Sequence, residues 1–164
     1  EPYIFAYFLG TTQEYRNAVK KLAHDKGMKV VALRHMDQYV EEDENFGDFA
    51  PYDVSPVRFL NFLRNAEYVC TDSFHGTAFS ILNEKQFVVF NRYAENSSFS
   101  KNSRIDTLCV NFSLESRRYK NGMDLSDVVK DDIDYKAVGE KYKNLKLVTD
   151  EYLNTILREI KGRA

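Results

Sequence analysis

YIFAYFLGTTQEYRNAVKKLAHDKGMKVVAL, residues 3–33, is the stretch in which the architecture of this chain first becomes recognisable. It opens with an apolar run over residues 3–9 that stops at Gly10, as is typical of a buried strand. An amphipathic helical pattern follows and ends at Gly27, a residue type that favours helix C-termini. A second apolar run over residues 28–33 predicts another strand. Strand, helix and strand in this order indicate a βαβ unit.

The same alternation continues along the chain. Ser55 and Pro56 predict a helix start, with serine as the cap and proline at the first helical position. Short apolar runs predict strands over residues 68–71 and 86–90, and a helix that begins near His75 lies between them. Strands that alternate with helices over short loops predict a Rossmann-like α/β fold, a parallel sheet with helices on both faces.

The remaining segments give weaker patterns. The acidic run at residues 41–44 is typical of a solvated loop. Ser103 is expected to cap a further helix, residues 113–133 predict no regular element, and the tail after Asp134 is expected to be helical. That tail carries an apolar stripe with helical spacing, formed by Tyr152, Leu153, Ile156, Leu157 and Ile160.

Length and composition favour one globular domain over residues 1–164. Hydrophobic residues make up 43% and charged residues 29% of the chain, a balance typical of folded rather than disordered proteins. The net charge of −2 argues against a nucleic-acid-binding protein that relies on bulk positive charge. No apolar run is long enough to span a bilayer, so we expect no transmembrane segment. The chain starts at Glu1 rather than at methionine, so we expect a longer parent protein.

Three loops carry the candidate functional residues, because ligands of parallel α/β sheets bind where strands run into helices at the carboxyl edge. The first is Gly10-Thr11-Thr12, a small turn before a helix, for which a glycine is also required by geometry alone. The second, TDSFHGT at residues 71–77, surrounds one histidine with small and polar residues. The third follows the fourth strand and combines two arginines and a lysine with serines and asparagines, a possible cradle for carboxylate or phosphate. Its polar residues are Asn91, Arg92, Asn96, Ser97, Ser98, Ser100, Lys101, Asn102, Ser103 and Arg104.

The histidine of the second loop is the strongest candidate for proton transfer. His75 lies at a predicted helix start, where a histidine side chain can deliver or accept a proton. Gly76 leaves the first turn uncrowded, so free N–H groups there could face an anion. Asp72 could orient the ring or cap the helix. The alternative is a capped helix with a satisfied histidine. His24 and His35 have no such neighbours and are predicted to be surface residues.

Several motifs in these loops resemble the polysaccharide pyruvyl transferase family. They are TDSFHGTAFSI at residues 71–81, FVVFNR at residues 87–92 and NSRIDTL at residues 102–108. The opening YIFAYFLG is similar as well. The resemblance implies the C-terminal Rossmann-like domain of a GT-B-like enzyme whose first domain is missing here. It also implies transfer of pyruvyl from phosphoenolpyruvate to a sugar hydroxyl pair, which forms a pyruvate ketal in exopolysaccharide or cell-surface glycan synthesis. No metal or redox cofactor is implied.

The resemblance suggests a role for each candidate residue. His75 would supply the acid/base function, Arg92 and Arg104 would clamp the carboxylate or phosphate, and Gly10 would line the donor cleft. The other expected binding residues are Thr11, Asp72, Ser73, Gly76, Thr77, Asn102 and Ser103. Some family members carry an arginine two residues before the histidine, where this chain has Ser73. The positive charge must then come from elsewhere, such as Arg92 or Arg104, or the donor differs.

Two other functions are compatible with the same pattern. One is a GT-B glycosyltransferase that uses a nucleotide-sugar donor, and the other is a non-catalytic anion- or glycan-binding module of the same fold. Only two cysteines, Cys70 and Cys109, are present, which fits a reducing compartment. We therefore expect a cytoplasmic protein that associates with membranes, if at all, through a lipid-linked glycan acceptor. In this family's architecture the C-terminal helix often reaches back to the first domain, so its apolar stripe is expected to be partly exposed.

Overall fold

A parallel sheet forms the centre of the molecule. The structure is a computed structural model that describes residues 1–93 and 101–161 of the chain. The strands in this part are β1 (Tyr3–Tyr7), β2 (Lys29–Leu33), β3 (Tyr68–Thr71) and β4 (Gln86–Val89). They form one sheet in the order β2-β1-β3-β4, and all neighbouring pairs are parallel. The predicted Rossmann-like parallel sheet is confirmed.

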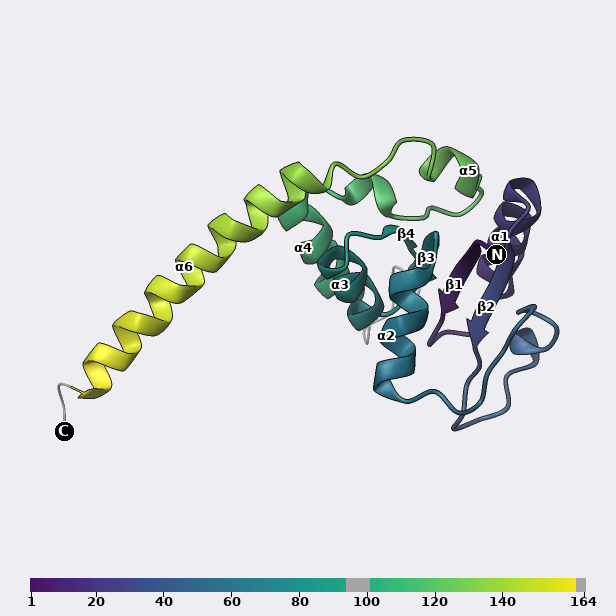
Figure 1. The fold of residues 1–164 in the computed structure, drawn as a ribbon, viewed down its shortest axis with the longest axis horizontal. Coiled ribbons are helices and arrows are strands. Elements are labelled where there is room, and N and C mark those ends of the chain that lie inside the picture. The colour runs from purple at the N-terminus through teal and green to yellow at the C-terminus, as the bar shows by residue number, and fades with distance from the viewer. Residues whose placement is uncertain (94–100, 162–164) are drawn as a thin grey trace.

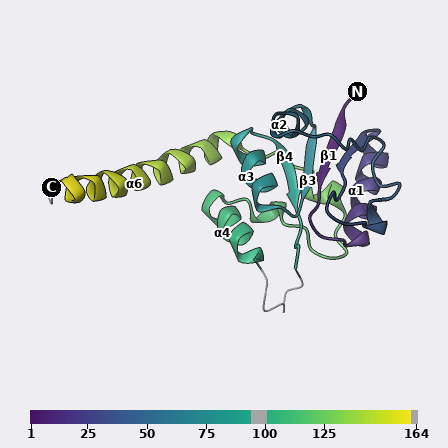
Figure 2. The same ribbon diagram turned by 90° about the horizontal axis from the view of Figure 1, so that it is seen from below.

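Helices cover both faces of this sheet. They are α1 (Gln13–Lys26), α2 (Pro56–Asn65), α3 (Phe74–Leu82), α4 (Asn102–Phe112), α5 (Leu125–Val128) and α6 (Tyr135–Lys161). On one face, Ile4 of β1 belongs to a buried cluster with residues of α1 and α5. On the other face, Phe5 packs in a second cluster with residues of α2, α3 and α4 (Figures 1 and 2). Because β1 is buried on both faces, its sequence is continuously apolar.

The predicted helix boundaries follow from local hydrogen bonding. The Ser55 side chain accepts a hydrogen bond from the Arg58 amide at 3.3 Å, with Pro56 at the first position of α2. Gly27 ends α1 in the left-handed region at φ 63°, where glycine has no Cβ penalty. These two boundaries are confirmed.

Other local predictions were wrong. Helix α4 begins at Asn102, so Ser103 lies inside its first turn instead of capping it. Residues 113–133 contain a 3₁₀ turn, Glu115–Arg117, and the short helix α5. Arg117 holds these two elements in place. Its buried guanidinium donates hydrogen bonds to the backbone carbonyls of Val128, at 3.1 Å, and Asp131. These partners lie too far along the chain to be visible as a local pattern.

The acidic run is also not simply a solvated loop. It forms the 3₁₀ turn Glu41–Asp43, in which Asp43 is buried with 6% exposure. Asp43 Oδ1 accepts a hydrogen bond from Arg16 Nε at 3.0 Å, and Arg16 itself is fully buried in α1. A buried carboxylate is tolerated here because the guanidinium compensates its charge.

Helix α6 extends away from the rest of the molecule, as Figure 1 shows. Its first turns pack on the core through Val138. Farther along, the predicted stripe is confirmed as helical but is largely uncovered, with exposures of 66% for Tyr152, 51% for Leu153 and 61% for Ile160. No helix in the described residues has the length and apolar character needed to cross a bilayer.

Candidate active site

A pocket of about 280 Å³ lies at the carboxyl ends of β3 and β4, beside the N-terminus of α3. We call it the His75 pocket. It is lined by Leu9, Asp72, Ser73, Phe74, His75, Arg92, Tyr93, Lys101, Asn102, Arg104 and Ile105. The location is the edge at which parallel α/β sheets bind ligands.

The first turn of α3 uses part of its own hydrogen-bonding capacity. The Ser73 side chain caps the helix by accepting from the Gly76 amide at 3.3 Å. The Ser73 carbonyl accepts from both the amide and the hydroxyl of Thr77 at 2.9 Å. Within the described residues, the amides of Phe74 and His75 donate to no other group of the chain. Two N–H groups at the positive end of the helix therefore remain for an anion.

Gly76 has a packing role that the sequence reading missed. A Cβ at this position would lie 2.5 Å from the Thr71 Oγ1 atom. The Thr71 hydroxyl in turn donates to the Tyr7 carbonyl at 2.6 Å and accepts from the Ser73 amide at 3.1 Å. Glycine is thus required for close contact between α3 and β3, and Gly76 is buried rather than part of the pocket lining.

Asp72 holds a neighbouring turn rather than the histidine. Its buried carboxylate accepts hydrogen bonds from the Leu9 amide at 2.7 Å and the Gly10 amide at 2.8 Å. Burial raises the pKa of Asp72, while these two amides and the nearby Arg92 favour its charged form. A Cβ on Gly10 would lie 2.9 Å from Oδ2 of this carboxylate. The predicted roles of Asp72 were therefore wrong. Its carboxylate neither orients His75 nor caps α3, which is capped by Ser73.

Positive charge gathers around the pocket. Arg104 lies with its guanidinium carbon 4.5 Å from the centre of the Phe74 ring, and Arg92 lies 5.4 Å from that of Tyr93. Lys101 lines the same pocket. None of these three cations pairs with a carboxylate in the described part of the chain. Since the charge of Asp72 is already engaged by two amides, the site is suited to an anionic ligand.

Comparison with known proteins assigns the family. The sequence model of the polysaccharide pyruvyl transferase family matches residues 1–93, more than half of the 164 residues. The chain belongs to the polysaccharide pyruvyl transferase family. The match includes the His75 loop and Arg92 and ends before Lys101 and Arg104. No protein of curated function matches the sequence significantly.

Solved structures resemble this pyruvyl transferase family member in fold. A putative UDP-N-acetylglucosamine 2-epimerase from Listeria monocytogenes aligns with a TM-score of 0.53 and 16% identity over 85% of this chain and 38% of the epimerase. UDP-GlcNAc 2-epimerase from Neisseria meningitidis, bound to UDP-GlcNAc, aligns with a TM-score of 0.47 and 10% identity over 93% and 45% of the two chains. The first likeness supports the Rossmann-like fold. The chain spans less than half of the length of either structure.

The structure brings some of the predicted residues of this family member together and separates the others. Those that line one pocket are His75, Asp72, Ser73, Arg92, Asn102 and Arg104. Gly10 supports that pocket from behind, against Asp72 and Arg92. Thr11 is exposed outside the lining, and Thr77 is buried with its hydroxyl bonded within α3. Ser103 faces a different pocket that contains Asn91 and Arg118. Asn96, Ser97, Ser98 and Ser100 lie outside the described residues.

Asn102 joins the two described ends of the third loop. Its side chain donates to the Tyr93 carbonyl at 2.8 Å and accepts from the Tyr93 amide at 3.3 Å. The asparagine thereby fixes the position from which Lys101 and Arg104 reach the pocket. The lysine of the predicted cradle, Lys101, lines the pocket as well. Sequence reasoning missed Tyr93 and Phe74 as pocket residues, although each directly adjoins a residue that it selected.

His35 is the main correction among the histidines. Its side chain is only 7% exposed instead of lying on the surface, whereas His24 is exposed as predicted. Nδ1 lies 2.7 Å from Asp43 Oδ2, and the His35 amide donates to the same oxygen at 2.9 Å. Burial by itself lowers the pKa of His35, but the hydrogen bond with Asp43 and the backbone of Leu9 raise it above the ordinary value. The Leu9 backbone contributes to the raised pKa of His35 by its position near the ring, and it forms no hydrogen bond of normal geometry with Nε2.

In the described residues no group of three or more histidine, cysteine or carboxylate side chains is arranged to hold a metal ion. The two cysteines are both buried, and burial raises the pKa of the Cys70 thiol to about 12 and that of Cys109 to about 11. Neither thiol is therefore suited to act as a nucleophile near neutral pH.

Proposed function

We propose that this chain is the donor-binding domain of a pyruvyl transferase and that phosphoenolpyruvate occupies the His75 pocket. One observation carries the proposal: three cationic side chains and His75 surround a single pocket without carboxylate partners among the described residues. Phosphoenolpyruvate carries its carboxylate and its phosphate on the same carbon, C2, and so requires several positive groups at short range. Family membership supports the transferase class.

The two arginines suit the two anionic groups of the donor. A guanidinium can bind a carboxylate or a phosphate through two parallel hydrogen bonds. Arg92 and Arg104 approach the pocket from opposite ends of the third loop and can hold one group each. The amides of Phe74 and His75 add two donors at the start of α3. Arg92, Arg104 and Lys101 thus replace the charge that some family members place two residues before the histidine, where this chain has Ser73.

The proposed reaction joins one carbon to two sugar oxygens. A sugar hydroxyl adds to C2 of phosphoenolpyruvate and loses its proton, while C3 takes up a proton and becomes a methyl group. The C2–O bond to phosphate then breaks, and a second hydroxyl of the same sugar adds to C2 and loses its proton. The products are a pyruvate ketal and inorganic phosphate. His75 provides the proton for C3 or accepts one from the attacking hydroxyl, as a histidine side chain can do. No cofactor is required by this sequence of steps.

The acceptor is expected to enter from a second domain. His75 is exposed in this chain, whereas transfer rather than hydrolysis requires that water be excluded from the reacting atoms. A preceding N-terminal domain that closes over the carboxyl edge of the sheet would provide this. The uncovered stripe of α6 is a surface on which such a domain could pack. A glycan acceptor, on a lipid carrier at the cytoplasmic side of a membrane, would then lie between the two domains.

The first test is donor binding by the chain itself. We expect phosphoenolpyruvate to raise the midpoint of thermal unfolding and to shift the amide resonances of Phe74 and His75. Arg92→Ala and Arg104→Ala should each weaken binding by about tenfold, because each removes a charge-assisted contact. Arg158→Ala, an exposed arginine on α6, is the matched control and should leave binding unchanged. Stabilisation by nucleotide sugars but not by phosphoenolpyruvate would indicate the glycosyltransferase alternative.

The second test requires a protein that carries this chain and its preceding domain. His75→Gln should slow phosphate release from phosphoenolpyruvate and a glycan acceptor by about a hundredfold or more, as expected for a lost acid/base group. Binding of phosphoenolpyruvate should change far less. A near wild-type rate in this variant would exclude His75 as the catalytic group. Donor binding without phosphate release on any acceptor would point to the non-catalytic alternative.

A further inference from the structure

The aromatic ring of Phe74 has no part in the function proposed above, although it lies in the His75 pocket. Phe74 is the first residue of α3, and Arg104 belongs to the first turn of α4. The guanidinium carbon of Arg104 lies over the Phe74 ring, 4.5 Å from its centre. The ring therefore connects the starts of two helices at the place where the donor is proposed to bind.

The core holds this ring in position. Phe74 is partly buried and packs against the cluster of buried residues that includes Ile81 and Ile105. The His75 ring meets the Phe74 ring edge to face, with 5.8 Å between the ring centres and 82° between the ring planes. Phe74 is thus a fixed surface that contacts both an arginine and the histidine of the pocket.

An arginine that lies over an apolar ring keeps its full hydrogen-bonding capacity. The five N–H groups of a guanidinium lie in its plane, and the attraction between the cation and the ring face uses none of them. In the part of the chain that the structure describes, Arg104 pairs with no carboxylate and donates to no backbone carbonyl. Its side chain is therefore held in place while its donors remain available for a ligand.

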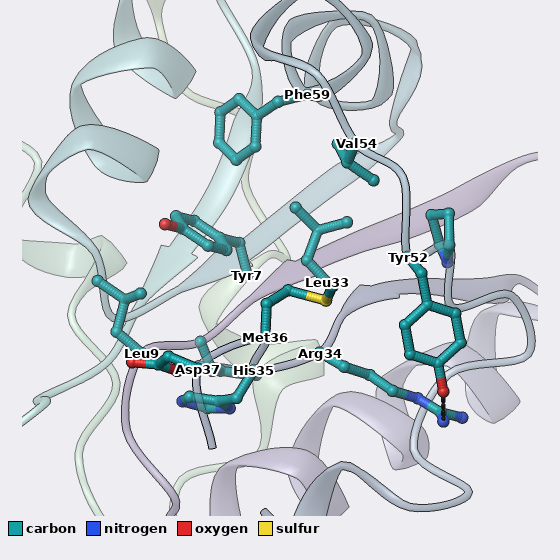
Figure 3. A pocket seen from close by; sticks show the side chains of 12 residues that line it. Tyr7, Leu9, Leu33, Arg34, His35, Met36, Asp37, Tyr52, Val54 and Phe59 are labelled. Carbon is teal, nitrogen blue, oxygen red and sulfur yellow. Dashed lines mark hydrogen bonds between the residues drawn. The ribbon is translucent and has the colours of Figure 1, made fainter. Parts of the chain in front are cut away.

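Arg34 shows a contrasting arrangement in the pocket at the carboxyl ends of β1 and β2, which is drawn in Figure 3. Its guanidinium carbon lies 5.8 Å from the centre of the Tyr52 ring, and one of its N–H groups donates to the Tyr52 hydroxyl at 3.1 Å. Arg34 thus uses one of its donors to hold its position. The Phe74 side chain has no polar atom, so Arg104 is held without the use of any donor.

We propose that Phe74 is a positioning residue for donor binding, which holds Arg104 on its ring with the guanidinium donors free for the ligand. The assignment rests on the proposed function, in which Arg104 binds one anionic group of phosphoenolpyruvate. Ordering a long side chain is part of the free-energy cost of binding, and an arginine that is already in place avoids this cost. Because the same ring contacts His75, it also sets the position of the arginine relative to the acid/base group.

The test is a double-mutant cycle on phosphoenolpyruvate binding by the chain, followed in ¹H–¹⁵N spectra. Phe74→Leu should weaken binding by about fivefold, the scale of one cation–π contact. In the Arg104→Ala background the same change should have less than about a twofold effect, because the arginine that Phe74 positions is gone. In the Arg92→Ala background the effect should stay at about fivefold. Phe74→Tyr keeps the ring and should bind within about twofold of the wild type.

Phe79→Leu is the matched control. Phe79 is another partly buried phenylalanine of α3 that packs on the same cluster, but it contacts Phe59, with 6.3 Å between the ring centres, and does not line the pocket. This change should lower stability in urea unfolding and leave donor binding unchanged.

The outcomes separate this role from the proposed function. A fivefold loss in Phe74→Leu that persists without Arg104, or an equal loss in Phe79→Leu, overturns the positioning role and leaves the proposed function intact. Failure of Phe74→Tyr to restore binding also overturns that role alone. Absence of phosphoenolpyruvate binding by the wild type contradicts the proposed function, and the role of Phe74 with it.

Discussion

Single residues in this chain show how contacts between distant segments assign roles that neighbours in sequence do not reveal. Asp72 follows a strand and precedes a helix, a position at which a carboxylate commonly caps the helix. Its partners are instead the amides of Leu9 and Gly10, more than sixty positions earlier. His35 and Asp43 form a similar case, since each looked like a surface residue when considered alone. The partners of such polar groups are set by tertiary packing, so sequence reasoning could not find them.

Gly76 gives a prediction at the residue scale. Gly76→Ala places a methyl group 2.5 Å from Thr71 Oγ1, and we expect a loss of about 1–3 kcal/mol in the free energy of unfolding because α3 must shift. Gly139→Ala is the control, since a Cβ there meets nothing within 4 Å. In the middle of a helix this change should be neutral or stabilising by up to about 1 kcal/mol. Urea unfolding measures both, and equal effects of the two changes would contradict the packing role of Gly76.

The ion cluster around His35 gives a prediction about pH. The pKa of His35 is raised in the folded protein, so its protonated form favours folding. This stabilisation is fully present below the unfolded pKa of about 6.5 and is lost as pH rises through the folded pKa. We expect the stability advantage of the wild type over His35→Gln to be larger at acidic than at alkaline pH, within the range where Asp43 stays charged. Denaturant unfolding across that range measures it, and an advantage that grows with pH would contradict the assignment.

At the scale of elements, the strands and most helices were predictable because they depend on local patterns. The apolar run of β1 and the Ser55-Pro56 start of α2 report burial and capping within a few residues. The 3₁₀ turn at Glu115–Arg117 and helix α5 were missed. The hydrogen bonds of the buried Arg117 hold these elements in place, and their sequence has no regular spacing of apolar residues that would predict them. The site was predictable to a similar extent. Its position at the strand ends follows from topology, whereas the split between pocket-lining residues and supporting ones does not.

The link between two loops gives a prediction at this scale. Asp72→Asn replaces an oxygen that accepts an amide hydrogen bond with an NH₂ group that cannot accept one. The turn between β1 and α1 should lose one of its two bonds to the side chain at position 72, just after β3, at a cost of about 1–3 kcal/mol. Amide exchange at Leu9 and Gly10 should accelerate more than exchange in α1. Asp150→Asn alters a surface carboxylate whose ion pair is with Lys146 on the same helix, and this change should affect neither quantity.

At the scale of the whole molecule, α6 is the feature that the sheet domain does not explain. The helix runs for 27 residues, and the part beyond its first turns presents an apolar stripe to solvent (Figure 1). Exposed apolar surface of this extent marks a contact surface. In the proposed two-domain protein the preceding domain covers it, and in this chain alone it is available for self-association.

This difference can be measured. The chain should self-associate with increasing concentration in sedimentation velocity, and the combined substitutions Leu153→Lys and Ile160→Glu, both on the stripe, should shift it toward monomer. Leu147→Lys removes an apolar residue of similar exposure, 61%, from the other side of the helix, as its 3.6-residue period places it. That control should leave self-association unchanged. In the protein that carries the preceding domain, the stripe amides of α6 should gain protection from hydrogen exchange. Equal exchange rates in both proteins would mean that the helix does not serve as the contact between domains.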